Sequence, residues 1–282
     1  MTPAALHVTR RPAEASDAPT VVFVHGSLDR GESFRRVVRR LPDFAAVCYD
    51  RRGYQRSREA GTTGLSGHVD DLLGLAERAR ADSGGPVVAV GHSFGGDVVV
   101  AAALADPRAF GAVAAYEPPM PWLGFRRQPA PRGRTSGWLP LADDPGDEAE
   151  AFYSRMMGPT AWGRLNPDTQ ASRRADGPAL VADLNSFRVD GPPFDVLALD
   201  VPAVFAMGGP ESAPHHRRTV EWLAAHVHGA SGCEITAARH GAHLSHPDHF
   251  AALAREVVLR ATGAPTAPGD SGDEPDGEGE GD

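Results

Sequence analysis

A serine near the middle of the chain lies in a glycine-rich turn that could present its hydroxyl as a nucleophile. Residues 91–96 read Gly-His-Ser-Phe-Gly-Gly, and they directly follow the apolar run at residues 86–90. An apolar helical segment, residues 97–105, comes next. The spacing G-x-S-x-G between a strand and a helix is typical of a sharp turn with an exposed serine at its apex. The sequence therefore predicts a nucleophilic Ser93 rather than a serine that only caps a helix.

A nucleophilic serine needs partners that the rest of the chain must supply. Its hydroxyl reacts poorly at neutral pH unless an adjacent base removes the proton and a carboxylate orients that base. Attack on a carbonyl also creates an oxyanion, which two backbone N–H groups must stabilise. Phe94, the residue after the nucleophile, supplies one of these groups in this type of turn. The chain has 12 histidines, and several of them lie in residues 239–250.

The elements that would position these groups alternate regularly along the chain. Continuous apolar runs predict strands, and the segments between them predict helices. The predicted strands are residues 20–24, 45–49, 86–90, 111–116, 201–207 and 233–237. The predicted helices are residues 34–41, 69–81, 97–105, 219–227 and 250–262. This alternation is typical of an α/β fold with a mostly parallel sheet and helices on both faces. Functional groups are then expected at the carboxyl ends of the strands.

Three segments of the chain, taken in order, resemble the α/β-hydrolase fold family. They are His25-Gly26 after the first predicted strand, residues 50–57, and the turn around Ser93, and a histidine late in the chain completes the pattern. The resemblance extends from about residue 6 to residue 262. It implies a serine hydrolase of the esterase-like type, with a helical lid inserted into the sheet domain.

The same resemblance implies further residues of the site. Leu28, with Ser27 as the alternative, would supply the second N–H group for the oxyanion. The base would be His240, which lies seven residues before the proline that opens the last helix. His243 would be a second histidine close to that base. The resemblance gives His25 the task of holding its turn in shape rather than of transferring protons.

A metal site is the rival interpretation of the late histidines. His240, His243, His246 and His249 recur every three residues. Pro247 would interrupt any helix that could present all four on one face. No carboxylate-rich segment accompanies them, so the pattern favours a catalytic base over metal ligands. Neither a metal nor a cofactor is expected, because the predicted chemistry needs neither.

The orienting acid has two candidates, because the resembled family places it in either of two registers. One register gives Glu211, in the loop after the strand at residues 201–207. The other gives Glu117, directly after the strand at residues 111–116. We favour Glu117, since a strand end positions a side chain more rigidly than a loop and an acid in so apolar a run needs a partner. Glu211 stays as the alternative.

The chain divides into a core, an insertion and a tail. The core is expected at residues 1–117 and 200–262, with the helical lid at residues 118–199 between them. More than half of the aromatic and methionine side chains of the lid are expected to form its own core. The candidates for lining a substrate pocket are Trp122, Phe125, Phe152 and Met156. The acidic tail at residues 263–282 has almost nothing apolar to bury and is expected to be disordered.

Composition narrows the classes of function. The formal net charge is −9, but seven acidic residues lie in the tail, so the body is near neutral and nucleic acid is not an expected partner. No apolar run is long enough for a membrane span, and no signal peptide is evident, which favours a cytoplasmic protein. The expected partner is a small-molecule ester, thioester or lactone.

Three other classes remain as alternatives on this fold. They are cofactor-free haloperoxidase or perhydrolase chemistry, a lyase acting on hydroxynitriles, and a non-catalytic ligand-binding receptor. An intact Ser93, a base and an available acid count against the receptor. Dehalogenases and epoxide hydrolases of this fold carry an aspartate where this chain has Ser93, and are disfavoured.

Overall fold

The computed structural model describes residues 5–125 and 140–263, and seven strands within them form one sheet in the order β1-β3-β2-β4-β5-β6-β7. The strands are β1 (Val8–Arg11), β2 (Thr20–Val24), β3 (Ala45–Tyr49), β4 (Val87–His92), β5 (Ala112–Tyr116), β6 (Ala203–Gly208) and β7 (Ala230–Ile235). Strand β1 pairs antiparallel with β3, and the other pairs are parallel. The predicted α/β fold with a mostly parallel sheet is confirmed.

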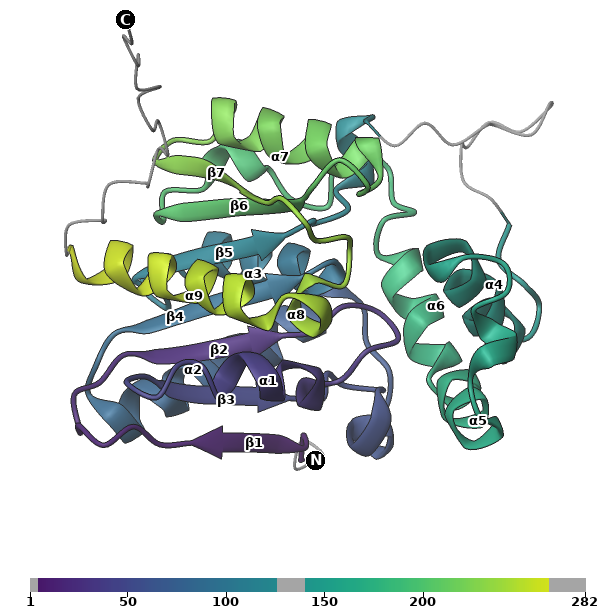
Figure 1. The fold of residues 1–282 in the computed structure, drawn as a ribbon, viewed down its shortest axis with the longest axis horizontal. Helices are drawn as coiled ribbons and strands as arrows, with labels where there is room; N and C mark the ends of the chain where they lie inside the picture. Colours follow the sequence, from purple (N-terminus) through teal and green to yellow (C-terminus); the bar gives the residue numbers. More distant parts are fainter. Residues whose placement is uncertain (1–4, 126–139, 264–282) are drawn as a thin grey trace, which may run out of the picture.

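Helices cover both faces of this sheet (Figure 1). On one face, α2 (Leu65–Ser83), α3 (Phe94–Ala105) and α7 (Pro214–His226) pack against side chains such as Val22 and Val24. On the other face, α1 (Arg35–Val38) and α9 (Pro247–Thr262) pack against Val21 and Phe23. Successive residues of β2 therefore point into two separate apolar layers, as expected of a strand that is buried on both sides. A short helix, α8 (Ala242–Ser245), leads into α9.

Two elements of the fold gave no apolar signal in the sequence. Strand β1 is an edge strand with two of its four residues exposed, so it has no continuous apolar run. Helix α5 (Pro167–Ala175) has no buried residue, so its sequence shows no apolar stripe. The helix predicted at residues 34–41 is instead a 3-10 turn, η1 (Gly31–Phe34), followed by the four residues of α1.

Three helices, which we call the helical insertion, lie beyond the end of the sheet toward which the parallel strands point (Figure 1). They are α4 (Pro145–Met157), α5 (Pro167–Ala175) and α6 (Gly177–Asn185). Asp144 caps α4 and Asn166 caps α5, and each helix has a proline in its first turn, where the missing N–H costs nothing. Gly177 packs so closely on α4 that a Cβ atom there would lie 2.1 Å from the Pro145 carbonyl oxygen.

The predicted division of the chain into core, lid and tail stays a prediction. Residues 126–139 of the expected lid and residues 264–282 of the expected tail lie outside the described residues. Within the described parts of the chain, no helix is long and apolar enough to cross a membrane.

A buried carboxylate ties the helical insertion to the sheet domain. Asp183 of α6 accepts hydrogen bonds from both Nη atoms of Arg51, at 3.0 and 2.7 Å. Tyr54 and Ser27 donate their hydroxyls to it, each at 2.6 Å, and His68 donates from Nε2 at 3.1 Å. Burial alone would raise the pKa of Asp183, but the charge of Arg51 and the hydrogen bonds from Arg51 and His68 hold that pKa well below its usual range. Asp183 is therefore ionised and joins four donors of the sheet domain to α6.

A second carboxylate joins α5 to the same region. Asp176, fully buried between α5 and α6, accepts the backbone N–H of Gln55 at 3.0 Å and the Nε of Arg58 at 2.6 Å. Both donors belong to the 3-10 helix η2 (Gln55–Ala60). The helical insertion is thus held to the sheet domain at two points by charged hydrogen bonds.

Replacing Asp183 by alanine should destabilise the protein strongly. The side chain of Arg51 is completely buried, and the substitution leaves its charge without the carboxylate. Removing one partner of such a pair costs about 3–5 kcal/mol, so we expect a loss of that order in the free energy of unfolding, measured by urea denaturation. Asp190→Ala removes an exposed carboxylate seven residues further along the chain and should change stability by less than about 0.5 kcal/mol. Equal stability of the two variants would contradict the role given to Asp183.

Candidate functional site

Ser93 lies at the apex of the turn between β4 and α3, in a conformation that few residues adopt. Its φ is 53° and its ψ is −129°, a strained combination that costs about 1–3 kcal/mol. The flanking glycines make the turn possible. A Cβ atom on Gly91 would lie 2.2 Å from the Gly95 carbonyl oxygen, and one on Gly95 would lie 2.2 Å from the Val24 carbonyl oxygen. The Ser93 N–H donates to the Tyr116 carbonyl oxygen at 2.8 Å, which fixes the turn to the end of β5.

Of the two expected sources of N–H groups for an oxyanion, Phe94 directly follows Ser93, and the turn that holds Ser27 and Leu28 passes Ser93 at Gly26. Phe94 is the first residue of α3, so its N–H has no partner within the helix. The second turn follows β2. A Cβ atom on Gly26 in this turn would lie 2.9 Å from the Cβ of Ser93, so the turn runs directly past the serine. Neither Ser27 nor Leu28 donates its backbone N–H to an acceptor among the described residues. Leu28 has a φ of 55°, in the left-handed region.

His25 fixes the start of this second turn. Its Nδ1–H donates to the Gly26 carbonyl oxygen at 2.7 Å, and its Nε2 accepts the Arg51 backbone N–H at 2.8 Å. The Arg51 side chain returns a hydrogen bond from Nε to the His25 carbonyl oxygen at 2.9 Å. Burial, together with the nearby charge of Arg51, lowers the pKa of His25 to about 4. Both ring nitrogens of a neutral His25 are therefore engaged in the turn.

The structure brings Glu117 to His240. The Nδ1–H of His240 donates to Oε2 of Glu117 at 2.6 Å. The other carboxylate oxygen, Oε1, accepts the backbone N–H of Gly208 at 2.8 Å and the hydroxyl of Ser212. Glu117 is fully buried and has a φ of 47°, directly after β5. Burial raises its pKa, but the hydrogen bonds from His240, Ser212 and Gly208 outweigh burial and lower that pKa below its usual value.

Two further histidines hold His240 in place. His92, the residue before the serine, donates from Nε2 to the His240 carbonyl oxygen at 2.7 Å. Burial and the neighbouring His243 and His240 lower the pKa of His92 well below its usual value, so His92 is a neutral donor. The ring of His216, from α7, stacks on His240 with centroids 4.8 Å apart. His216 Nε2 also lies 3.7 Å from Oε2 of Glu117.

The alternative residues of the sequence analysis lie elsewhere. The side chain of Glu211 is 71% exposed and pairs with Arg239, so its carboxylate is engaged at the surface. His243 is buried, and its Nε2 donates to Asp29 at 3.1 Å while its ring contacts His92. The geometry thus joins His240 with Glu117 and does not join it with Glu211.

Two groups of three residues in the described chain bring ligand-type atoms within 4.8 Å of one another. They are Asp29, His92 and His243 in the first group and Glu117, His216 and His240 in the second. The four late histidines of the rival metal interpretation are not brought together, because His240 and His243 belong to different groups and His246 pairs with Ser245. In each group the facing atoms already include a carboxylate–imidazole hydrogen bond.

The four predicted pocket residues are spread over two regions. Trp122 packs against Phe187 and Phe194 and against the apolar layer of the sheet domain, and Phe125 contacts Trp222. Phe152 lies in the helical insertion and packs on a cluster of five buried residues. That cluster comprises Leu28, Tyr54, Ala149, Ala179 and Leu180. Met156 is half-buried on the same helix. Phe152 is therefore the one of the four that packs on a cluster containing Leu28, a candidate oxyanion residue.

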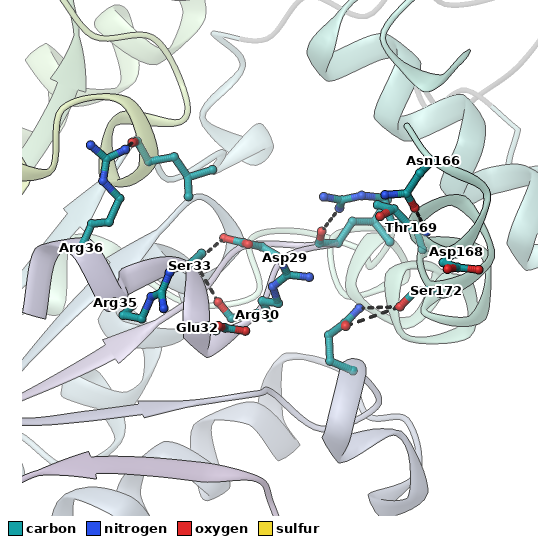
Figure 2. Close-up of a pocket in the computed structure, with 14 residues that line it drawn as sticks. Asp29, Arg30, Glu32, Ser33, Arg35, Arg36, Asn166, Asp168, Thr169 and Ser172 are labelled. Carbon is teal, nitrogen blue, oxygen red and sulfur yellow. Dashed lines mark hydrogen bonds between the residues drawn. The ribbon is translucent and has the colours of Figure 1, made fainter. Parts of the chain in front are cut away.

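A pocket of about 440 Å³ opens between residues 28–36 of the sheet domain and helix α5. Its lining includes Leu28 and Arg173, which face each other across the boundary of the helical insertion. Figure 2 shows Asp29 and Ser33 on the sheet-domain side and Asn166, Thr169 and Ser172 on the α5 side. The boundary between the two parts of the protein is thus accessible next to the turn that holds Leu28.

Sequence reasoning missed several residues around this site. His92 stands inside the serine motif, so its position was known, but no pattern indicated that it would hold the loop of His240. Ser212 lies in the loop after β6, and His216 lies in the first turn of α7, ahead of the helix predicted from residue 219. Nothing in the sequence linked them to Glu117, and only the folded chain brings them there.

Comparison with known proteins identifies the family and the fold of the chain. The model of a family described as the alpha/beta hydrolase family matches residues 21–255. The lipase LipV of Mycobacterium tuberculosis is 30% identical over 162 residues, which are 57% of this chain. The match spans 58% of the length of that lipase, less than two thirds.

Solved structures of the same fold cover nearly the whole chain. An esterase from Thermogutta terrifontis superposes with a TM-score of 0.62 at 18% identity, covering 93% of this chain and 96% of the esterase. An alpha/beta hydrolase from Sphaerobacter thermophilus superposes with a TM-score of 0.60 at 20% identity, covering 90% of this chain and 96% of that protein. At these identities the likeness establishes the fold.

The neutral state of His25 makes stability depend on pH. Because the pKa of His25 is about 4 in the folded chain and about 6.5 when unfolded, the unfolded chain binds more protons between these values. Stability is therefore complete above about pH 6.5 and falls as the pH drops toward 4, by about 3 kcal/mol for this residue. Urea denaturation between pH 7.5 and 4.5 measures this loss. His25→Asn should take up one proton fewer on unfolding in this range, and an identical pH slope in both proteins would contradict the assignment.

Proposed function

The chain belongs to the alpha/beta hydrolase family, and from that premise we propose that it is a serine hydrolase that cleaves small to medium esters, thioesters or lactones. In this proposal Ser93 is the nucleophile, His240 the general base and acid, and Glu117 the orienting carboxylate. The observation that carries the proposal is the 2.6 Å hydrogen bond from His240 Nδ1 to Glu117. A proton held at Nδ1 leaves Nε2 with a free electron pair, which is what a base for a serine hydroxyl requires.

The reaction would proceed in two halves. In the first, Oγ of Ser93 attacks the carbonyl carbon of the substrate while its proton passes to Nε2 of His240. The tetrahedral intermediate then collapses, the bond to the leaving group breaks, and His240 returns the proton to the departing oxygen or sulfur. In the second half, water attacks the acyl-enzyme in the same way, and its proton passes through His240 back to Oγ of Ser93.

The oxyanion of each intermediate would lie between two backbone donors. Phe94 supplies one N–H from the start of α3, and Leu28, with Ser27 as the alternative, supplies the other. Such donors are effective because they are held in place before the charge develops. The short distance between Gly26 and Ser93 supports this assignment, because it brings the second turn against the nucleophile.

The imidazolium that forms at His240 would be stabilised by the charge of Glu117. The lowered pKa of Glu117 keeps its carboxylate ionised at neutral pH, after burial has been outweighed by its three hydrogen bonds. The stacked ring of His216 restricts the rotation of the His240 ring, and the hydrogen bond from His92 to the His240 carbonyl oxygen fixes the loop that carries it. Apolar side chains around Leu28, including Phe152, support an apolar acyl or alcohol portion in the substrate.

The test of this proposal is the turnover of p-nitrophenyl esters of varied acyl length by the wild-type protein and by Ser93→Ala. We expect the wild type to turn over at least one ester and Ser93→Ala to lose at least about 10⁴-fold in kcat. A fluorophosphonate should label the wild type on Ser93, as located by peptide mass mapping. Ser245→Ala removes an exposed hydroxyl elsewhere and should behave as wild type. Residual esterase activity near the wild-type level in Ser93→Ala would contradict the proposal.

A further inference from the structure

The turn after β2 adopts a conformation that its own residues do not favour. Leu28 has a φ of 55°, in the region that glycine occupies readily and leucine does not. His25 fixes the beginning of the turn, through its bonds to Gly26 and Arg51. The residues that follow, Ser27 and Leu28, need other contacts to stay in this conformation.

Those contacts come from the helical insertion. The hydroxyl of Ser27 donates to Asp183 of α6 at 2.6 Å. The carbonyl oxygen of Leu28 accepts a hydrogen bond from the guanidinium Nη1 of Arg173, in α5. This second contact lies at the wall of the pocket drawn in Figure 2, where residues 28–36 face α5. The Ser27 hydroxyl and the Leu28 carbonyl, which directly follow Gly26 in this turn, are therefore both held by residues of the helical insertion.

Arg173 binds the Leu28 carbonyl oxygen but forms no ion pair among the described residues. Its guanidinium lies over the ring of Tyr153, 4.7 Å from the centroid, which limits its movement. No carboxylate lies within salt-bridge distance of it in the described chain, and its Nε is buried. The neighbouring Arg174 differs, because it pairs with Glu150 at 2.8 Å and with Asp147, all within the helical insertion. The charge of Arg173 is thus directed at a backbone carbonyl.

We infer that Arg173 is a positioning residue of the oxyanion hole, through which the helical insertion holds the backbone of Leu28 in the conformation that directs its N–H toward the oxyanion. This inference rests on the proposed function. With the Leu28 carbonyl held by Arg173, the backbone of Leu28 stays in the left-handed conformation and the N–H of the turn keeps its direction. Without Arg173, Leu28 can relax to an ordinary backbone conformation, and the N–H turns away from the oxyanion.

A residue that acts in this way affects the transition state more than the bound substrate. The oxyanion exists only in the tetrahedral intermediates, so a displaced donor lowers kcat and leaves KM nearly unchanged. Complete removal of one donor from an oxyanion hole lowers kcat by about 10²–10³-fold. A donor that is displaced rather than deleted should cost less, and we expect about 10- to 100-fold.

The experiment compares Arg173→Met with Arg174→Met as its matched control. Methionine keeps the length of the side chain but removes the donors and the charge. Circular dichroism and thermal unfolding establish that each variant is folded. The readouts are kcat and KM with the best p-nitrophenyl ester for the wild type, and the inhibition constant of an alkyl trifluoromethyl ketone. The adduct of this ketone with a serine carries an oxyanion, so its affinity reports on the oxyanion hole.

For Arg173→Met we expect kcat to fall about 10- to 100-fold, KM to stay within about threefold, and the inhibition constant of the ketone to rise by the same factor as kcat falls. Arg173→Lys retains a charged donor and should recover most of kcat. Arg174→Met should stay within about twofold of wild type, because its ion pairs are exposed. If Arg173→Met does not fold, Arg173→Leu, which also lacks donors, replaces it with the same expectations.

Three results would overturn the inference. The first is a kcat of Arg173→Met within twofold of wild type. The second is an effect confined to KM, which would assign Arg173 to substrate binding. The third is an equal loss in Arg174→Met, which would show a general effect of the helical insertion. A wild-type protein without ester turnover and without labelling of Ser93 would instead defeat the proposed function.

Discussion

A carboxylate without any exposed surface, that of Glu117, organises the carboxyl edge of the sheet. Removing an ionised carboxylate from water is costly unless donors replace the lost solvation. Glu117 obtains them from two segments that are distant from it in the chain: Gly208 and Ser212, at the end of β6 and in the loop that follows, and His240, after β7. Each segment is thereby fixed relative to β5. The need to satisfy one buried charge thus determines where the histidine lies.

The same physical constraint operates at the boundary with the helical insertion. Asp183 is also fully buried, and it collects donors from Arg51, Tyr54, His68 and Ser27. Glu117 organises the histidine that would serve as the base, and Asp183 organises the turn that would supply an oxyanion donor. Ser93 itself is placed by backbone geometry, through the glycines on either side of it. Two buried carboxylates and one strained turn therefore account for the arrangement of the site.

Much of this arrangement was predictable because it depends on local patterns. Strand β2 was predicted with its observed limits, since all five of its residues are buried and apolar or nearly so. The turn around Ser93 was evident from the spacing of its glycines. Glu117 could be favoured over Glu211 because it ends an apolar run, and the structure does bring it to His240. The catalytic roles of these residues stay predictions.

The remainder depends on contacts between distant residues, which no local pattern encodes. Asp183 and Arg51 are 132 positions apart, and neither stands in a recognisable motif for the other. Helix α5 has no buried residue, so its apolar pattern was absent, yet it carries Arg173. Ser212 lies in an irregular loop and His216 in the first turn of α7, and both reach Glu117 only when β6 pairs with β5.

The central claim is that Glu117 and His240 act together on Ser93, and the most direct measurement is kcat of Glu117→Gln beside Glu211→Gln. An amide at position 117 can donate to the ring and so favours the wrong tautomer of His240, which should lower kcat by about 10⁴-fold. Glu211 forms an exposed ion pair, and its substitution should leave kcat within about twofold of wild type. A collapse of activity in Glu211→Gln with near-normal turnover in Glu117→Gln would contradict the account.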